Sequence, residues 1–410
     1  MTPADLLRAM FDRAVAVADP MQSLAAALPP RPAGRVVVIG AGKASARMAE
    51  AVEAEWGPCE GLVITRYGYA RPCQGIEIIE AAHPVPDMAG VLATRRMLDL
   101  LATLDEGDFV LALISGGGSA LLCAPAEGIT LDEKQALTQA LLASGAPIGT
   151  INGIRKEISA VKGGRLAAAA WPARMLALLI SDVPGDDPGD IASGPTVGHD
   201  GSAARALAAL ETWGVTPPAS IKAFLEAGGD PVRPDDPRLA RVENVIYAAP
   251  AQSLAAAAGL ARAQGYAVDT LGDAIEGEAR EVAAAHAALA LKTRGPRVIL
   301  SGGELTVTRR GDGVGGPNAE YALALALALN GAPGIHAIAC DTDGVDGAAE
   351  VAGAVIGPDT LARARAAGAD AAGALAINDA HGFFHRIDRQ VVPGPTLTNV
   401  NDFRAILIEG

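Results

Sequence analysis

The chain has 410 residues, of which half are apolar and only 3% aromatic, and its formal net charge at pH 7 is −14. At about 150 residues per domain, this length predicts two or three domains. The negative charge argues against a nucleic acid or another large polyanion as partner, so a small anionic ligand would need a local basic cluster.

The cysteines and the amino terminus indicate the compartment. Cys59, Cys73, Cys123 and Cys340 form no C-x-x-C pair, which predicts reduced thiols in a cytoplasmic protein. The first residues show the apolar periodicity of a helix and lack the basic and apolar regions of a signal peptide. No apolar run reaches the roughly 18 residues that span a bilayer, so we expect no membrane partner.

Strands and helices alternate along the first half of the chain. Residues 4–27 read as an amphipathic helix, and apolar strands are expected at 35–39, 61–65, 76–79, 109–114 and 175–180. This alternation predicts a parallel, doubly wound α/β sheet. Residues 228–237 are rich in Pro, Gly and Asp and form the best linker candidate. We therefore expect an N-terminal domain over 1–235 and a second α/β domain over 236–410.

The first strand runs into Gly40-Ala41-Gly42-Lys43, a glycine turn followed by a helix. Lys43 could neutralise a phosphate held at the start of that helix. The spacing Gly40-x-Gly42-x-x-Ser45 also nearly matches the dinucleotide fingerprint. Because the next strand ends at Arg66 and not at an acid, an enzyme of that kind would prefer NADP, which leaves a reductase as an alternative.

A second glycine turn, Ser115-Gly-Gly-Gly-Ser119, follows the strand at 109–114. Three successive glycines are costly unless the backbone must approach a ligand, so Gly117, Gly118 and Ser119 are predicted to bind a substrate carboxylate or a phosphate. A basic helix over 150–165 follows, in which Arg155 and Lys162 share one face at i, i+7 spacing. These two residues are predicted to hold an acidic substrate.

Further glycine and aspartate loops follow later strands. Ser301-Gly302-Gly303-Glu304 repeats the strand–Ser-Gly-Gly pattern. Strand-end carboxylates with phosphate oxygens and water suit Mg²⁺, and the predicted metal ligands are Asp182, Asp187, Asp343 and Asp346. Asp190 is a candidate for orienting an attacking hydroxyl. The Walker pattern is missing and the six histidines are dispersed, so the set indicates phosphoryl transfer outside the P-loop class.

The ordered motifs resemble one known family, the glycerate 2-kinases with a C-terminal MOFRL domain. The blocks that carry the resemblance include residues 40–45, 151–156, 181–186, 192–196, 341–347 and 398–402. The resemblance implies phosphorylation of D-glycerate to 2-phosphoglycerate with ATP and Mg²⁺. It also implies a Rossmann-like domain and a MOFRL domain with the active site in the cleft between them, and an essential role for Lys43.

The resemblance extends the nucleotide-binding candidates into the glycine loop at 311–318. The complete set is Gly40, Gly42, Ser301, Gly302, Gly303, Glu304, Gly315, Gly316 and Asn318. Many relatives have arginine where this chain has Pro317. Some relatives carry the label of hydroxypyruvate reductase, and a non-catalytic sensor of sugar acids or nucleotides would use the same residues. We expect a monomer or a homodimer.

Overall fold

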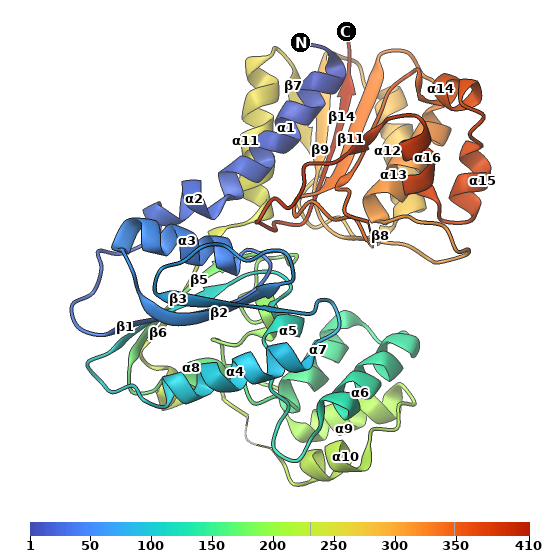
Figure 1. The fold of residues 1–410 in the computed structure, drawn as a ribbon. Coiled ribbons are helices and arrows are strands. Elements are labelled where there is room, and N and C mark those ends of the chain that lie inside the picture. Colours follow the sequence, from blue (N-terminus) through green and yellow to red (C-terminus); the bar gives the residue numbers. More distant parts are fainter. Residues whose placement is uncertain (230, 348) are drawn as a thin grey trace. The chain divides into compact units, whose positions relative to one another are not determined.

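The computed structural model describes residues 1–229, 231–347 and 349–410, which form two compact units (Figure 1). The parallel-sheet unit contains Ser23–Ser181 and Asp186–Tyr247. The mixed-sheet unit contains Met1–Gln22, Asp182–Gly185 and Ala248–Gly410. None of the helices in the described part of the chain is long and apolar enough to cross a membrane.

The parallel-sheet unit is built on one six-stranded sheet in the order β3-β2-β1-β4-β5-β6. Its strands are β1 (Val36–Ala41), β2 (Glu60–Arg66), β3 (Ile76–Ala81), β4 (Phe109–Ile114), β5 (Arg174–Ile180) and β6 (Val242–Ala248). Every residue of β1 and β4 is buried, as expected for parallel strands covered on both faces. The parallel pairing of β1 with β2 and β4, of β2 with β3 and of β4 with β5 confirms the doubly wound parallel sheet. Its strand order is that of dinucleotide-binding folds.

Helices cover this sheet and also form a cluster of their own. The helices are η1 (Leu24–Ala26), α3 (Ser45–Trp56), α4 (Met88–Leu101), α5 (Gly118–Leu121), α6 (Leu131–Ala143), α7 (Ile148–Glu157), α8 (Arg165–Ala169), η2 (Ile191–Ser193), α9 (Ala203–Thr212), α10 (Ala219–Glu226) and η3 (Pro237–Leu239). Helices α6, α7, α9 and α10 lie together (Figure 1). They share an apolar core that includes Leu137, Ile154, Leu210 and Ile221.

The basic helix predicted over 150–165 ends earlier in the structure, and the prediction that Arg155 and Lys162 share one helix face is wrong. Helix α7 ends at Glu157, and a turn separates it from α8. Ser159 forms an isolated β-bridge with Pro125, and Gly164, whose φ is 82°, is the N-cap residue at which α8 begins. Arg155 and Lys162 therefore lie on different structural elements.

The mixed-sheet unit contains a six-stranded sheet in the order β13-β12-β11-β14-β9-β7 and a separate β10-β8 pair. The strands are β7 (Ala267–Thr270), β8 (Gly277–Glu278), β9 (Arg297–Ser301), β10 (Leu305–Thr306), β11 (Ile335–Asp341), β12 (Gly353–Ile356), β13 (Gln390–Val391) and β14 (Asp402–Ile408). In the larger sheet β7 and β9 pair in parallel, whereas the pairs from β9 through β14, β11 and β12 to β13 are antiparallel.

Helices pack on both faces of this second sheet, among them α1 (Pro3–Ala18) and α11 (Pro250–Ala263) on one face and α12 (Ala279–Lys292) and α13 (Pro317–Leu329) on the other (Figure 1). The other helices are α14 (Thr360–Ala366), α15 (Ala371–Ala376) and α16 (Ala380–Arg386), and the short helix α2 (Pro20–Ser23) lies at the limit of this unit. One apolar core joins α1 and α11 to Leu407 and its face of β14, and another joins α12 and α13 to Ile406 and the opposite face. Period-two alternation along β14 thus supplies both cores.

The division of the chain differs from the proposed limit between residues 235 and 236. Helix α1 begins with a capping box in which Thr2 and Asp5 bond each other, and it packs in the mixed-sheet unit. Residues 242–247 add the edge strand β6 to the parallel sheet. The predicted linker, 228–237, falls within the parallel-sheet unit, except that Asp230 lies outside the described residues.

Candidate functional site

Two glycine turns lie side by side where strands β1 and β4 end. Ala41, the last residue of β1, pairs with Ile114, the last residue of β4. Because the chain winds in opposite directions from these two strands, their carboxyl ends form the topological switch point at which open α/β sheets bind ligands. The turns that follow, at residues 42–44 and 115–119, are therefore the first place to look for a ligand site.

The first turn has no backbone donor left for a phosphate. The N–H of Gly42 donates to Ile64 O at 3.1 Å, and that of Lys43 donates to Gly116 O at 2.8 Å. The N–H of Ala44 donates to Ser115 Oγ at 3.0 Å. These three donors hold the neighbouring strand ends together, so a pyrophosphate could not bind on them in the manner of a dinucleotide fold.

Close packing explains the glycines of this first turn. A β-carbon on Gly42 would lie 2.0 Å from Ser115 Oγ, and one on Gly40 would lie 2.4 Å from Leu113 O. Nucleotide binding by Gly40 and Gly42 thus gains no support from their contacts. These contacts also weaken the hypothesis that Gly40-x-Gly42-x-x-Ser45 binds NADP, because the packing alone accounts for both glycines.

The second turn offers donors that the first turn lacks. Within the described part of the chain, the N–H groups of Gly116, Gly117 and Ser119 have no hydrogen-bond acceptor. Gly117 has φ +80°, a value at which glycine is favoured. Gly118 differs, because its N–H donates to Ser115 O and a β-carbon there would lie 2.6 Å from Ala192 Cβ. Gly116, Gly117 and Ser119 are therefore the candidate anion cradle, called the cradle below.

Two cationic or titratable side chains flank the cradle. A β-carbon on Gly117 would lie 3.0 Å from Lys43 Cγ and 3.2 Å from His83 Cδ2. His83 was not among the residues predicted to form the site, because the six histidines are dispersed along the chain. Its position in the turn directly after β3 was the signal that could have identified it, since that turn lies at the same edge of the sheet.

A backbone segment in an unusual conformation supports the cradle from the other side. Ala192, Ser193 and Gly194 have φ values of 53°, 64° and 60°, and such strain in residues other than glycine is concentrated at functional sites. The Ser193 hydroxyl lies 2.7 Å from the Ser119 hydroxyl. This contact fixes the side chain of Ser119, which was predicted to bind substrate.

The nearby acidic loop makes local contacts. Asp190 Oδ1 lies 3.4 Å from Lys156 Nζ, and Asp187 accepts a hydrogen bond from Gly189 N at 2.7 Å. Both aspartates are exposed. Their predicted roles, hydroxyl orientation for Asp190 and metal binding for Asp187, stay predictions.

A group of buried cations lies behind the cradle. Lys162 is fully buried, and its Nζ donates to the backbone oxygens of Leu122 and Ala192 at 3.3 and 3.4 Å. Lys134 is 3% exposed, and its Nζ donates to Cys123 Sγ at 3.5 Å. Burial lowers the pKa of Lys162 well below its usual range, and the charges of Lys134 and Arg155 lower that pKa further. The three positive side chains are thus close enough to repel one another.

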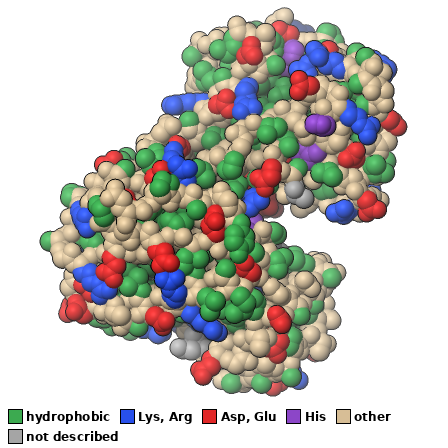
Figure 2. All heavy atoms as spheres, viewed as in Figure 1, with side chains coloured by type: hydrophobic (Ala, Val, Ile, Leu, Met, Phe, Trp, Pro, Cys, Tyr) green, Lys and Arg blue, Asp and Glu red, His purple; other side chains and the backbone are tan. Residues whose placement is uncertain are grey.

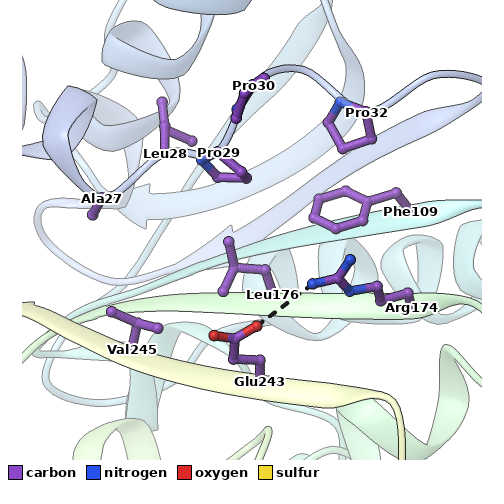
Figure 3. Close-up of a pocket in the computed structure, with 10 residues that line it drawn as sticks. All are labelled: Ala27, Leu28, Pro29, Pro30, Pro32, Phe109, Arg174, Leu176, Glu243 and Val245. Carbon is purple, nitrogen blue, oxygen red and sulfur yellow. Dashed lines mark ion pairs between the residues drawn. The ribbon is translucent and has the colours of Figure 1, made fainter.

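Another cavity lies at the opposite end of the sheet, under residues 29–32 (Figure 3). Its volume is about 440 Å³, and Phe109 and Arg174, which begin β4 and β5, line it. Arg174 pairs with Glu243 at 3.6 Å. Because ligands of such sheets bind at the carboxyl ends of the strands, this cavity is not the candidate site.

The Ser-Gly-Gly turn in the mixed-sheet unit differs from the turn at 115–119, because a buried arginine binds its carbonyl groups. The N–H of Gly302 donates to Gly272 O at 2.8 Å. Arg404, which is buried, donates to the carbonyls of Gly302 and Gly303 at 2.5 and 3.2 Å and to Asp402 Oδ2 at 2.9 Å. Ser301 accepts from Arg404 Nε at 3.4 Å, so Arg404 binds the acceptors of this turn, while Glu304 is exposed.

The glycine loop at 311–318 contacts Asp346, one of the predicted metal ligands. Asp346 is buried and accepts from the N–H groups of Asn318 and Ala319 at 3.0 and 2.8 Å. A β-carbon on Gly316 would lie 2.4 Å from Asp346 Cγ. The side chain of Asp346 therefore occupies the amino end of α13, where Gly315, Gly316 and Asn318 were expected to bind nucleotide phosphate.

The remaining acidic candidates have the ligand chemistry of Mg²⁺. Asn399 donates to Asp182 Oδ2 at 3.0 Å, and the N–H of Thr396 donates to Asp343 O at 3.4 Å. The loops of Asp182 and Asp343 thus contact the same segment, 396–401. Among the described residues, no three acidic, His or Cys side chains gather as a metal site. Since Mg²⁺ uses one or two carboxylates beside phosphate and water, Asp182 and Asp343 stay candidate ligands, and Asp343 accepts through Oδ1 from Val345 N at 2.8 Å. Asp346 is the weaker candidate because both of its carboxylate oxygens accept from α13.

The comparisons with known proteins agree with this architecture. Two family models match the chain, the "Domain of unknown function (DUF4147)" at residues 6–226 and the MOFRL family at residues 297–402. A D-glycerate 2-kinase of Thermotoga maritima is 37% identical over 93% of this chain and 93% of its own length. The chain belongs to the MOFRL-type glycerate 2-kinase family. The resemblance seen in the sequence and the prediction of an enzyme are therefore confirmed.

A solved member of the glycerate kinase group shares the fold. The crystal structure of a glycerate kinase from Thermotoga maritima has a TM-score of 0.87 at 35% identity and covers 98% of this chain and 99% of that chain. A protein of Agrobacterium vitis that is provisionally named hydroxypyruvate reductase is 50% identical over 98% of this chain and 94% of its own length. Within the MOFRL-type glycerate 2-kinase family, the names of relatives thus differ in reaction type.

Proposed function

We propose that this protein phosphorylates the 2-hydroxyl group of D-glycerate with ATP and Mg²⁺. The observation that carries the proposal is the cradle of Gly116, Gly117 and Ser119 with Lys43 beside it. Unpaired backbone donors and a nearby lysine bind and neutralise the oxygens of a transferring phosphoryl group. Family membership supports the same reaction class, because the Thermotoga maritima relative is a D-glycerate 2-kinase.

The side chains of the parallel-sheet unit would act by position and charge. Lys43 would neutralise charge that develops on the phosphoryl oxygens, and the three N–H groups would hold those oxygens in place. In a loose transition state the attacking hydroxyl need not lose its proton early. His83, on the other side of Gly117, could orient that hydroxyl as a hydrogen-bond partner.

Asp182 and Asp343 would hold Mg²⁺, which when bound neutralises phosphate charge. Asp187 stays a further candidate, and its carboxylate, like that of Asp343, accepts a backbone N–H within its own turn. We also propose a reducing cytoplasmic location, because Cys59, Cys73, Cys123 and Cys340 are free thiols. Whether the protein is a monomer or a homodimer can be measured by light scattering.

One assay tests the proposal against the reductase alternative. Purified protein is incubated with D-glycerate, ATP and Mg²⁺, and the product is identified by ³¹P and ¹³C NMR. We expect ADP and 2-phosphoglycerate. A parallel sample contains hydroxypyruvate and NADPH; oxidation of NADPH there, with no ADP formed in the first sample, would establish the reductase instead. Binding of glycerate without either reaction would indicate a sensor.

A further inference from the structure

A small cavity in the parallel-sheet unit carries positive charge. Its volume is about 240 Å³, and its lining includes Lys134 of α6, Arg155 of α7 and the loop of residues 84–86. No acidic side chain is among the residues that line it. Val85, Leu142 and Ile151 form the apolar part of its wall. A cavity of this composition suits a short organic anion.

The cations of this cavity have no counter-charge in the described part of the chain. The Lys134 ammonium is buried and contacts only one polar group, the thiol of Cys123, at 3.5 Å. Arg155 Nε is buried without a hydrogen-bond acceptor. Among the described residues, no aspartate or glutamate acts on the charge of either side chain, and the neighbour that favours both charges is the Cys123 thiol. Burying positive groups without partners is energetically unfavourable. An anion bound in the cavity would offset this cost.

The cavity and the cradle share one segment of chain. His83 flanks Gly117 of the cradle, and Pro84, the next residue, lines the cavity. An anion held by Lys134 and Arg155 is therefore close to the place where the phosphoryl group is proposed to be transferred. In a 2-hydroxy acid the carbon that bears the hydroxyl is bonded directly to the carboxylate carbon. A carboxylate in the cavity would therefore place the hydroxyl on the side of the cradle.

We propose that Lys134 and Arg155 bind the carboxylate of a short 2-hydroxy acid in this cavity, and that Lys134 determines the preference for an acid. This inference rests on the proposed kinase function. Arginine supplies planar paired donors and lysine a compact charge, which together suit a carboxylate. Within this proposal Lys162, which was predicted to bind substrate, acts as a positioning residue, because it is fully buried and donates to Leu122 and Ala192.

Calorimetry with the full chain tests the inference without ATP turnover. The variant Lys134→Met removes the ammonium group and keeps an unbranched side chain that reaches to the position of Cε. We expect glycerate to bind about 10- to 100-fold more weakly, the range for a lost hydrogen bond to a charged group, with the Kd of ATP changed less than twofold. Lys134→Arg should restore most of the binding. Wild-type protein should prefer glycerate over the neutral glyceramide, and Lys134→Met should lose that preference.

The matched control is Lys222→Met on α10, where the lysine side chain is 59% exposed and pairs with Glu226. This variant should bind glycerate as the wild type does. Equal weakening of ATP and glycerate in Lys134→Met, or unchanged glycerate binding, would overturn the inference. Inorganic phosphate is the third ligand: binding of phosphate that depends on Lys134, while glycerate binding does not, would assign the cavity to phosphate and also overturn it.

The kinase assay separates this inference from the proposed function. If Lys134-dependent glycerate binding occurs but no phosphate is transferred, the function is wrong and the carboxylate site stands. If glycerate is phosphorylated by Lys134→Met with an unchanged KM for glycerate, the function stands and the carboxylate site is wrong. A role of Lys134 in folding alone would lower the amount of active protein without raising KM or altering the choice between glycerate and glyceramide.

Discussion

Lys43 Cγ lies 3.0 Å from the position that a β-carbon on Gly117 would occupy. Gly117 also has φ +80°, so alanine there would both strain the backbone and displace the lysine. We predict that Gly117→Ala lowers kcat about 100-fold, the size of effect that a displacement near 1 Å can have. The measurement is steady-state phosphorylation of D-glycerate.

Gly128→Ala is the control for backbone strain. Gly128 has φ +81° and nothing within 4 Å of its β-carbon position. Both variants should lose about 1–2 kcal/mol of folding free energy, the cost of a left-handed alanine, and only Gly117→Ala should lose activity. Equal activity in the two variants would show that the surroundings of Gly117 do not matter for the reaction.

Lys43→Ala tests the charge beside the cradle. Removing one group that stabilises transition-state charge lowers kcat by about 10²- to 10³-fold, and we expect that range while the KM for glycerate changes little. Circular dichroism should show an unchanged fold. Lys292→Ala, at the exposed end of α12, should keep full activity; near wild-type turnover in Lys43→Ala would remove the lysine from the mechanism.

Arg404 stabilises the mixed-sheet unit from within. It is 1% exposed and bonds Asp402, itself buried, and two backbone carbonyls. We predict that Arg404→Met lowers the free energy of unfolding by about 3–5 kcal/mol, as expected when one partner of a buried ion pair is removed. Urea denaturation at pH 7 measures it.

Two further variants show which contacts of Arg404 account for the lowered free energy of unfolding. Arg297→Met breaks the partly exposed pair with Asp269 and should cost less than about 1 kcal/mol. Burial raises the pKa of Asp402 to about 6, although the charge of Arg404 opposes this shift. Adding Asp402→Asn to Arg404→Met should therefore recover part of the loss at pH 7. No recovery would mean that the carbonyl contacts of Arg404, and not the buried carboxylate, account for the effect.

His286 should make stability depend on pH. Burial, and then the charge of Arg404, lower the pKa of His286 from 6.5 to about 4, and its Nδ1 lies 2.8 Å from the Tyr321 hydroxyl. Below pH 6.5 the unfolded chain takes up a proton that the folded protein does not bind, so stability falls until about pH 4. The loss from this group is about 3 kcal/mol.

The test compares urea denaturation of the wild type and of His286→Gln between pH 7 and pH 4. The variant should lose less stability than the wild type over this interval. His385→Gln, at an exposed position, should follow the wild-type curve. Parallel curves for the wild type and His286→Gln would show that His286 is protonated in the folded protein at ordinary affinity.

The sequence predicted the parallel sheet and its glycine turns because buried strands leave long apolar runs. It could not predict which turn had free donors, since that depends on whether Ser115 accepts from Ala44. The antiparallel pairing in the second sheet could not be predicted from the sequence either, because strands that alternate with helices can pair in parallel or antiparallel.

The site residues show the same limit. Lys134 follows Asp132 and Glu133, a pattern typical of a solvent-exposed helix start, yet packing of α6 against its neighbours buries it. Asp346 looked like a metal ligand from its loop, but its carboxylate caps α13 across 27 or more residues of chain. The burial of Lys134 and the capping contact of Asp346 depend on residues far apart in the chain. The local sequence pattern carries no information about such contacts.

Helix α1 packs in the mixed-sheet unit on α11 and on strands β11 and β14. A ribosome makes this helix before residues 23–247 and makes β14 after them. Residues 23–247 can therefore acquire their fold on the nascent chain, while the apolar face of α1 stays uncovered until β14 has been synthesised. A fragment that starts after residue 22 would lack one wall of the second core, so expression of the C-terminal half alone should yield aggregated protein unless a peptide of residues 1–22 is supplied.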